Sequence, residues 1–183
     1  HMADTPERPT LIRLEEHENA EIMAHELRAG GLQYLFDLLA LQDHDPTILE
    51  ISEVAAQINT PDYNGTAFAM GAALTIGFGK RLYQSDSLAD VMSTNLRMAI
   101  NVMNDARDRH AVGVTRDDAY LHMMLALASE AEDAVPSVKE LVDKALATGS
   151  IAPSLQTAFR DGANFAAIGV RAAEEIHAIV RAW

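Results

Sequence analysis

The C-terminal segment, residues 153–183, carries a seven-residue repeat that constrains the fold more than any other feature of the chain. One set of apolar or small side chains recurs every seven residues, and a second set follows the first by four residues. This spacing predicts a long helix with a continuous seam, along which another helix packs. The two sets are Leu155, Gly162, Gly169, Ile176 and Trp183, and Phe159, Ala166, Ala173 and Val180.

The side chains of the seam are small at its centre and bulky at its ends. Glycine and alanine fill its middle, so two helix backbones can approach closely there, while larger side chains at both ends can clasp the partner. At 1.5 Å per residue such a helix is ~45 Å long, which exceeds the width of a domain of this size. Either two shorter helices line up against it, or part of it projects and meets a second copy. We therefore predict the seam as a protein interface.

Helical spacing also dominates the rest of the chain. Apolar residues recur at three- and four-residue intervals from Thr10 onward, and no stretch alternates as a strand would. We expect an all-α fold, a single-domain helical bundle of seven to eight helices over residues 10–183. Residues 1–9 are interpreted as a tag scar and a disordered leader, because His1-Met2 is typical of a cleaved tag and two prolines follow.

Several boundaries within the bundle can be predicted from capping and turn residues. Asp45-Pro46 should cap and begin a helix. Residues 59–65 collect turn-forming side chains and form the clearest loop, which is also the best candidate for a functional loop. Residues 66–84 should form a small-residue helix, broken or bent near residues 77–79. Residues 119–128 are apolar on every side, so this helix should be central and its His122 buried.

Composition excludes some classes of function and sets expectations for others. The chain has no cysteine, which removes disulfides, thiolate metal sites and cysteine nucleophiles. Its formal net charge of -13 disfavours direct binding to nucleic acid or to anionic membranes. The charge-free residues 63–79 are too few and too small for a bilayer span, and indicate a buried helix. We expect a soluble, cytoplasmic protein of prokaryotic or phage origin, without a cofactor.

No catalytic constellation is recognisable. The glycines and lysine of residues 77–80 lack the spacing, the following serine or threonine and the preceding strand of a phosphate-binding loop. The chain also lacks the Gly-x-Ser-x-Gly motif of a serine nucleophile. We therefore lean toward a protein that is not an enzyme.

Two groups of carboxylates and imidazoles are candidate metal ligands. Glu18, Glu21 and His25 share one face of the predicted first helix, and Glu174 and His177 form a Glu-x-x-His pair on the last. Helical di-metal sites require two such pairs and two further glutamates on four facing helices. The sequence supplies one pair and one set with different spacing, so we favour solvated charged faces and keep the metal site as the alternative.

The function that these features favour is a non-enzymatic, acidic helical module for protein interaction. Its partner would be a second copy of the chain or another protein, so that it acts as a homodimer or an adaptor. A sharper variant is an inhibitor whose acidic face occupies the basic groove of a nucleic-acid-binding enzyme. The alternative is a metal-dependent helical enzyme or metal-binding protein. A third possibility is a small-ligand pocket among the apolar helices and methionines.

Overall fold

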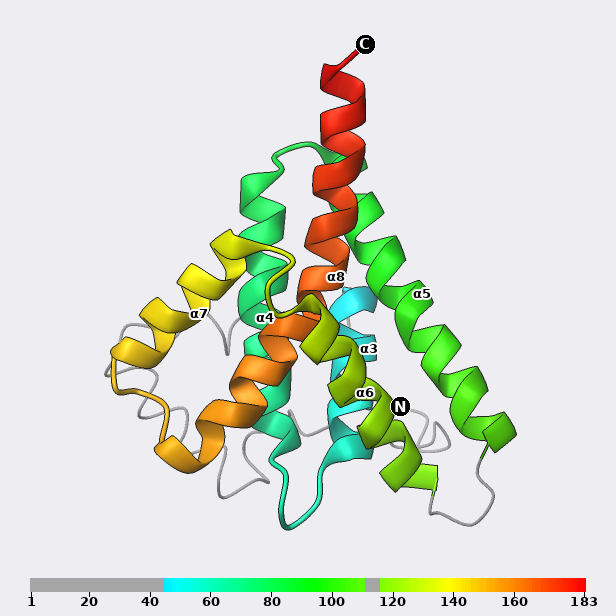
Figure 1. The fold of residues 1–183 in the computed structure, drawn as a ribbon, viewed down its shortest axis with the longest axis vertical. Helices are drawn as coiled ribbons and strands as arrows, with labels where there is room; N and C mark the ends of the chain where they lie inside the picture. Colours follow the sequence, from blue (N-terminus) through cyan, green and yellow to red (C-terminus); the bar gives the residue numbers. More distant parts are fainter. Residues whose placement is uncertain (1–44, 111–115) are drawn as a thin grey trace, which may run out of the picture.

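The computed structural model describes residues 45–110 and 116–183, and these residues form six α-helices and one short 3-10 helix (Figure 1). The all-α prediction is confirmed. The helices predicted before residue 45, and the leader, lie outside the described residues. The elements are α3 (Pro46–Ile58), α4 (Gly65–Leu82), α5 (Asp86–His110), α6 (Arg116–Ala131), α7 (Pro136–Ala147), η3 (Pro153–Leu155) and α8 (Gln156–Arg181).

Helices α4 and α8 form the centre of this arrangement and pack backbone against backbone. A Cβ atom at Gly162 of α8 would fall on the carbonyl oxygen of Phe68, and one at Gly71 of α4 would fall on that of Phe159. Thr75 donates a hydrogen bond across the same contact to the carbonyl of Ala163, at 3.0 Å. The close approach that the small residues predicted therefore occurs, and its partner is a helix of the same chain.

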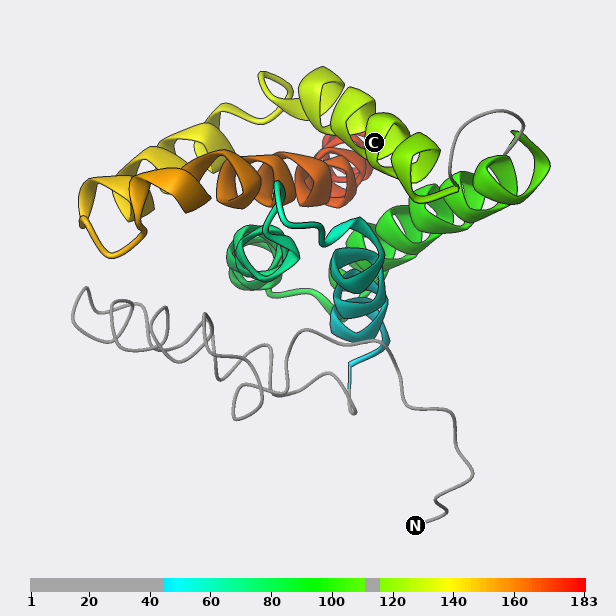
Figure 2. The ribbon, with the colours of Figure 1, turned by 90° about the horizontal axis from the view of Figure 1, so that it is seen from below.

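The remaining helices surround this pair (Figure 2). Helix α5 covers the next part of α8, where a Cβ atom at Gly169 would meet the carbonyl of Met92. Helices α6 and α7 also contact α8, and α3 packs against α4. The core that results is apolar and includes four large side chains that are fully buried, namely Phe68, Tyr120, Phe159 and Phe165.

Helix α6 differs from its prediction. Its buried residues Tyr120, Met124, Ala128 and Ala131 recur every three or four positions, so one face points inward. His122 is exposed, and the prediction of a buried histidine is wrong. The central position belongs to α4, all of whose residues from Gly65 to Ile76 are buried. The apolar composition of α6 did not predict its position, because alanine, leucine and methionine also occupy half-buried positions on a helix surface.

The predicted helix boundaries agree with the structure at most positions. The Asp45 carboxylate accepts from the amide of Thr47 at 2.9 Å, which confirms the predicted N-cap of α3. Helix α4 continues through residues 77–79 to Leu82, so the predicted break is absent. Gly79 serves packing instead, because a Cβ atom there would collide with the sulfur of Met92. Among the described residues, no helix is both long and apolar enough to cross a membrane.

Candidate functional site

The predicted seam of α8 is divided into a covered part and an exposed part. Most of its residues before position 174 are buried against this chain's own helices, so a second copy cannot reach them without unfolding the chain. Leu155 is half-buried beside them. In this part of α8, helices of the same chain therefore already cover the seam. The buried residues are Phe159, Gly162, Ala166, Gly169 and Ala173.

The last part of α8 projects beyond the other helices (Figure 1). Apolar side chains at positions i, i+3, i+4 and i+7 form one stripe; the first three lie on this helix end, and Trp183 follows two residues after it. Three of them continue the heptad repeat, and none is covered. The exposed fractions are 41% for Ile176, 52% for Ile179, 55% for Val180 and 92% for Trp183. We call these four residues the apolar stripe.

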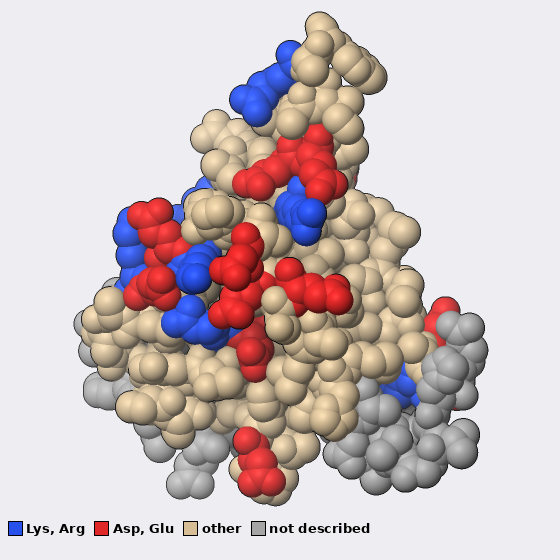
Figure 3. All heavy atoms as spheres, in the orientation of Figure 1, with Lys and Arg blue, Asp and Glu red and all other residues tan. Residues whose placement is uncertain are grey.

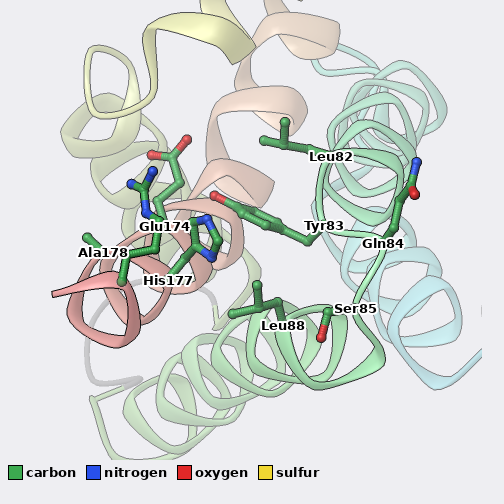
Figure 4. Close-up of a pocket in the computed structure, with 9 residues that line it drawn as sticks. Leu82, Tyr83, Gln84, Ser85, Leu88, Glu174, His177 and Ala178 are labelled. Atoms are coloured by element: carbon green, nitrogen blue, oxygen red, sulfur yellow. The ribbon is translucent and has the colours of Figure 1, made fainter. Parts of the chain in front are cut away.

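A pocket of about 600 Å³ lies along another face of the same helix end (Figure 4). Glu174, His177, Ala178 and Arg181 supply its α8 side. Each of these four residues comes two positions before a residue of the apolar stripe. Two positions correspond to roughly 200° around a helix, so the pocket and the apolar stripe lie on nearly opposite faces of α8. The other side of the pocket comes from the end of α4, the connection to α5 and the first turn of α5, through Leu82, Tyr83, Gln84, Ser85 and Leu88.

Tyr83 is the central residue of this pocket. Its ring is buried and meets the imidazole of His177 edge-on, with ring centroids 6.0 Å apart. Figure 4 shows the side chain reaching across from the α4 side toward Glu174 and His177. Burial raises the pKa of the Tyr83 hydroxyl; the charge of Glu174 raises it further, and that of Arg181 lowers it. The hydroxyl therefore lies within electrostatic reach of one carboxylate and one guanidinium.

The structure gives a partial view of the predicted metal ligands. Glu174 and His177 line the same pocket, as their spacing predicted, whereas Glu18, Glu21 and His25 lie outside the described residues. Within residues 45–110 and 116–183, no three histidine, aspartate or glutamate side chains are grouped so that they could hold a metal ion. What lies beside His177 is an aromatic ring rather than further carboxylates.

The loop of residues 59–65 is built from its own polar side chains. Asn59 accepts from the amide of Gly65 at 3.0 Å, and Asn64 accepts from the amide of Ala67 at 2.9 Å and so caps α4. The Tyr63 hydroxyl donates to the Asp161 carboxylate of α8 at 2.7 Å. Most of these turn-forming side chains thus hold the loop in place. A polar pocket of about 700 Å³ lies beside it, and any function of the loop stays a prediction.

The electrostatics of the Tyr63–Asp161 contact are those of a half-buried carboxylate. Burial raises the pKa of Asp161, and Glu132 raises it further, while the hydrogen bond from Tyr63 and the charge of Arg160 lower it. Burial and the Asp161 carboxylate in turn raise the pKa of the Tyr63 hydroxyl. The Tyr63 hydroxyl therefore keeps its proton at neutral pH and acts as the donor of the pair.

Sequence reasoning named only Glu174 and His177 among the residues that line the pocket, and it missed both Arg181 and Tyr83. Arg181 follows Glu174 by seven positions, and this spacing could have placed it on the face of Glu174 and His177. Tyr83 carried no such signal, because it comes from the far end of another helix and reaches the pocket only through the packing of α4 against α8. Comparisons with protein families, curated proteins and solved structures found no match to this chain.

Proposed function

We propose that this protein is a non-enzymatic protein-interaction module that binds a second copy of itself through the end of α8. The observation that carries the proposal is the uncovered apolar stripe. Large apolar patches on a soluble protein mark interaction sites, and an amphipathic helix with anchors at i, i+3, i+4 and i+7 is a recurring recognition element. Trp183 is the most exposed of the four anchors. Tryptophan is also enriched among the residues that dominate binding energy.

The geometry of the helix end favours antiparallel pairing with a second copy. Residues 176–181, the last of α8, rise ~9 Å along the helix axis, and Trp183 lies just beyond them. If two such ends lie side by side and antiparallel, Ile176 of one copy lies opposite Trp183 of the other, and Ile179 lies opposite Val180. The bodies of the two molecules then lie at opposite ends of the contact and do not collide. A parallel arrangement would instead force the two bodies against each other.

The small area of such a contact favours a weak dimer. Two single helix ends bury less than the ~800 Å² per partner of a standard stable interface. We therefore expect a concentration-dependent dimer with a dissociation constant on the order of 10–100 μM, weaker than an obligate dimer.

The distribution of charge gives less support to the inhibitor variant. On the face drawn in Figure 3, acidic and basic side chains lie next to one another over α7 and α8. Several of them pair, as Arg160 does with Asp143 and Arg171 with Glu175, each at 3.1 Å. The negative charge of the chain is therefore not gathered into one uniform patch on this face, which is what mimicry of a nucleic acid would require.

Native mass spectrometry and light scattering over a range of protein concentrations test the proposal. The mass should rise from one chain toward two as concentration increases. Ile179→Glu should abolish the rise, because it places a charge in the centre of the contact. Ala178→Glu adds the same charge on the opposite face and should leave the dimer intact. A single chain at every concentration would overturn self-association, and a dimer that survives Ile179→Glu would overturn this interface.

A further inference from the structure

The pocket on the opposite face of the α8 end has features that protein interaction does not explain. Its volume of about 600 Å³ falls within the range of small-molecule sites. Its lining combines an apolar surface, from Leu82, the Tyr83 ring, Leu88 and Ala178, with polar groups, of which the charged ones come from α8. Apolar walls with a few converging polar groups are the usual composition of a ligand site.

Two opposite charges in this pocket are not paired with each other. Within the described residues, neither the Glu174 carboxylate nor the Arg181 guanidinium forms an ion pair. By contrast, Arg171 and Glu175 on the same helix pair at 3.1 Å. Glu174 and Arg181 both line the α8 side of the pocket, and both charges act on the Tyr83 hydroxyl. Side chains on a helix lean toward its N-terminus, which directs Arg181 back toward Glu174 and Tyr83.

This arrangement selects the charge of a ligand. A simple anion would be attracted by Arg181 and repelled by Glu174, and a simple cation would meet the reverse. A dipolar molecule can satisfy both groups, with its carboxylate on Arg181 and the Tyr83 hydroxyl and its ammonium on Glu174. An apolar side chain attached to the same centre would then lie against Leu82 and Leu88 and remove their surface from water.

We propose that the Tyr83 pocket binds a small zwitterion with an apolar side chain, namely a free apolar α-amino acid. The proposal does not depend on self-association, because the apolar stripe and the pocket lie on nearly opposite faces of α8. The pocket is open and its charges are hydrated, so the affinity is modest, with a dissociation constant on the order of 1 mM.

Three probes that share the isobutyl side chain of leucine test the proposal by NMR titration of the 15N-labelled full chain. L-leucine carries both charges, 4-methylpentanoate lacks the ammonium group, and 3-methylbutylamine lacks the carboxylate. We expect L-leucine to shift the backbone amide resonances of residues 82–88 and 174–181 in a saturable manner. Each analogue should bind at least about fivefold more weakly than L-leucine, because it leaves one charge of the pocket unpaired.

Substitutions test which charge of the pocket binds each charged group of the ligand. Glu174→Gln should remove the preference for L-leucine over 4-methylpentanoate, and Arg181→Gln should remove its preference over 3-methylbutylamine. Glu175→Gln and Arg171→Gln, outside the pocket, should leave both preferences unchanged. The proposal is overturned if L-leucine shifts none of these resonances at about 20 mM, far above the expected dissociation constant. It is equally overturned if either analogue binds the unmodified chain as tightly as L-leucine.

Discussion

The two halves of α8 carry one heptad repeat and lie in different surroundings. In the first half, the seam residues from Phe159 to Ala173 pack against α4 and α5, and most are buried. In the second half, Ile176 and Val180 continue the repeat, and Trp183 continues it just beyond the helix end, but no helix of the described residues covers them. The same pattern thus produces a core in one place and an exposed surface in another. A heptad repeat specifies that a helix has a partner face, and it does not specify which chain supplies the partner.

The largest contrast between the halves should appear when an aromatic side chain is removed from each. Phe159→Ala should lower the free energy of unfolding by about 4 kcal/mol, because it removes a fully buried side chain and leaves a cavity. Trp183→Ala, at a position that is 92% exposed, should change it by less than about 0.5 kcal/mol. Urea unfolding followed by circular dichroism measures both. Equal losses in the two variants would show that the end of α8 is covered in the monomer.

A smaller effect should follow when a methyl group is added to the covered half. Gly162→Ala places a Cβ atom on the carbonyl of Phe68, so α4 and α8 must move apart, at a cost of about 2–3 kcal/mol. Alanine is otherwise a better helix former than glycine, which alone would favour the variant. Thermal unfolding decides between the two contributions. A variant as stable as the parent chain would mean that the two helices do not approach as closely as described.

The next effect concerns the contact that joins the loop of residues 59–65 to α8. Tyr63→Phe removes the donor to the Asp161 carboxylate and should cost about 1–2 kcal/mol, because the half-buried acceptor loses its partner. The same variant should raise the pKa of Asp161 further, because the hydrogen bond that lowers it is gone. NMR titration of the Asp161 side chain checks the pKa. No upward change would indicate that water replaces the tyrosine hydroxyl.

The smallest effect is a dependence of stability on acid pH at the start of α3. Burial alone would raise the pKa of Asp45, but its hydrogen bonds with Lys80 and with the amides of Ile48 and Thr47, together with the Lys80 charge, lower it below 3.8. Its contribution is therefore present above pH 3.8 and is lost as the pH falls through the lowered value. The difference in unfolding free energy between the parent chain and Asp45→Asn should be constant near neutral pH and shrink below pH 3.8. A constant difference throughout would exclude this linkage.

Much of the secondary structure was predictable because its signals are local. Asp45 and Pro46 mark the start of α3 through capping and a fixed backbone angle, which involve neighbouring residues only. Gly149, with φ of 72°, follows α7, and a glycine in this left-handed conformation is a common end of a helix. The heptad repeat of α8 likewise follows from spacing along one helix. Each of these signals is complete within a few turns of the chain.

The candidate site was predictable only in part. The Glu174–His177 pair shares a face because helical geometry requires it. Whether this pair could bind a metal depended on the residues that face it, and the structure places Tyr83 there rather than further metal ligands. The burial of α4 and the exposure of His122 also depended on which helices surround each element. Local composition does not contain that information, because apolar helices of similar pattern occur at the centre and at the surface.

The sequence by itself determined that the described chain is helical, where most of its helices begin and end, and that α8 has one continuous partner face. These properties arise from backbone geometry and side-chain spacing within single segments. Only the tertiary structure decided that α4 and α5 cover the first half of that face, that the end of α8 projects, and that Tyr83 joins Glu174, His177 and Arg181. Those outcomes depend on contacts between segments distant in sequence, where glycine allows close approach and the length of α8 exceeds that of its neighbours.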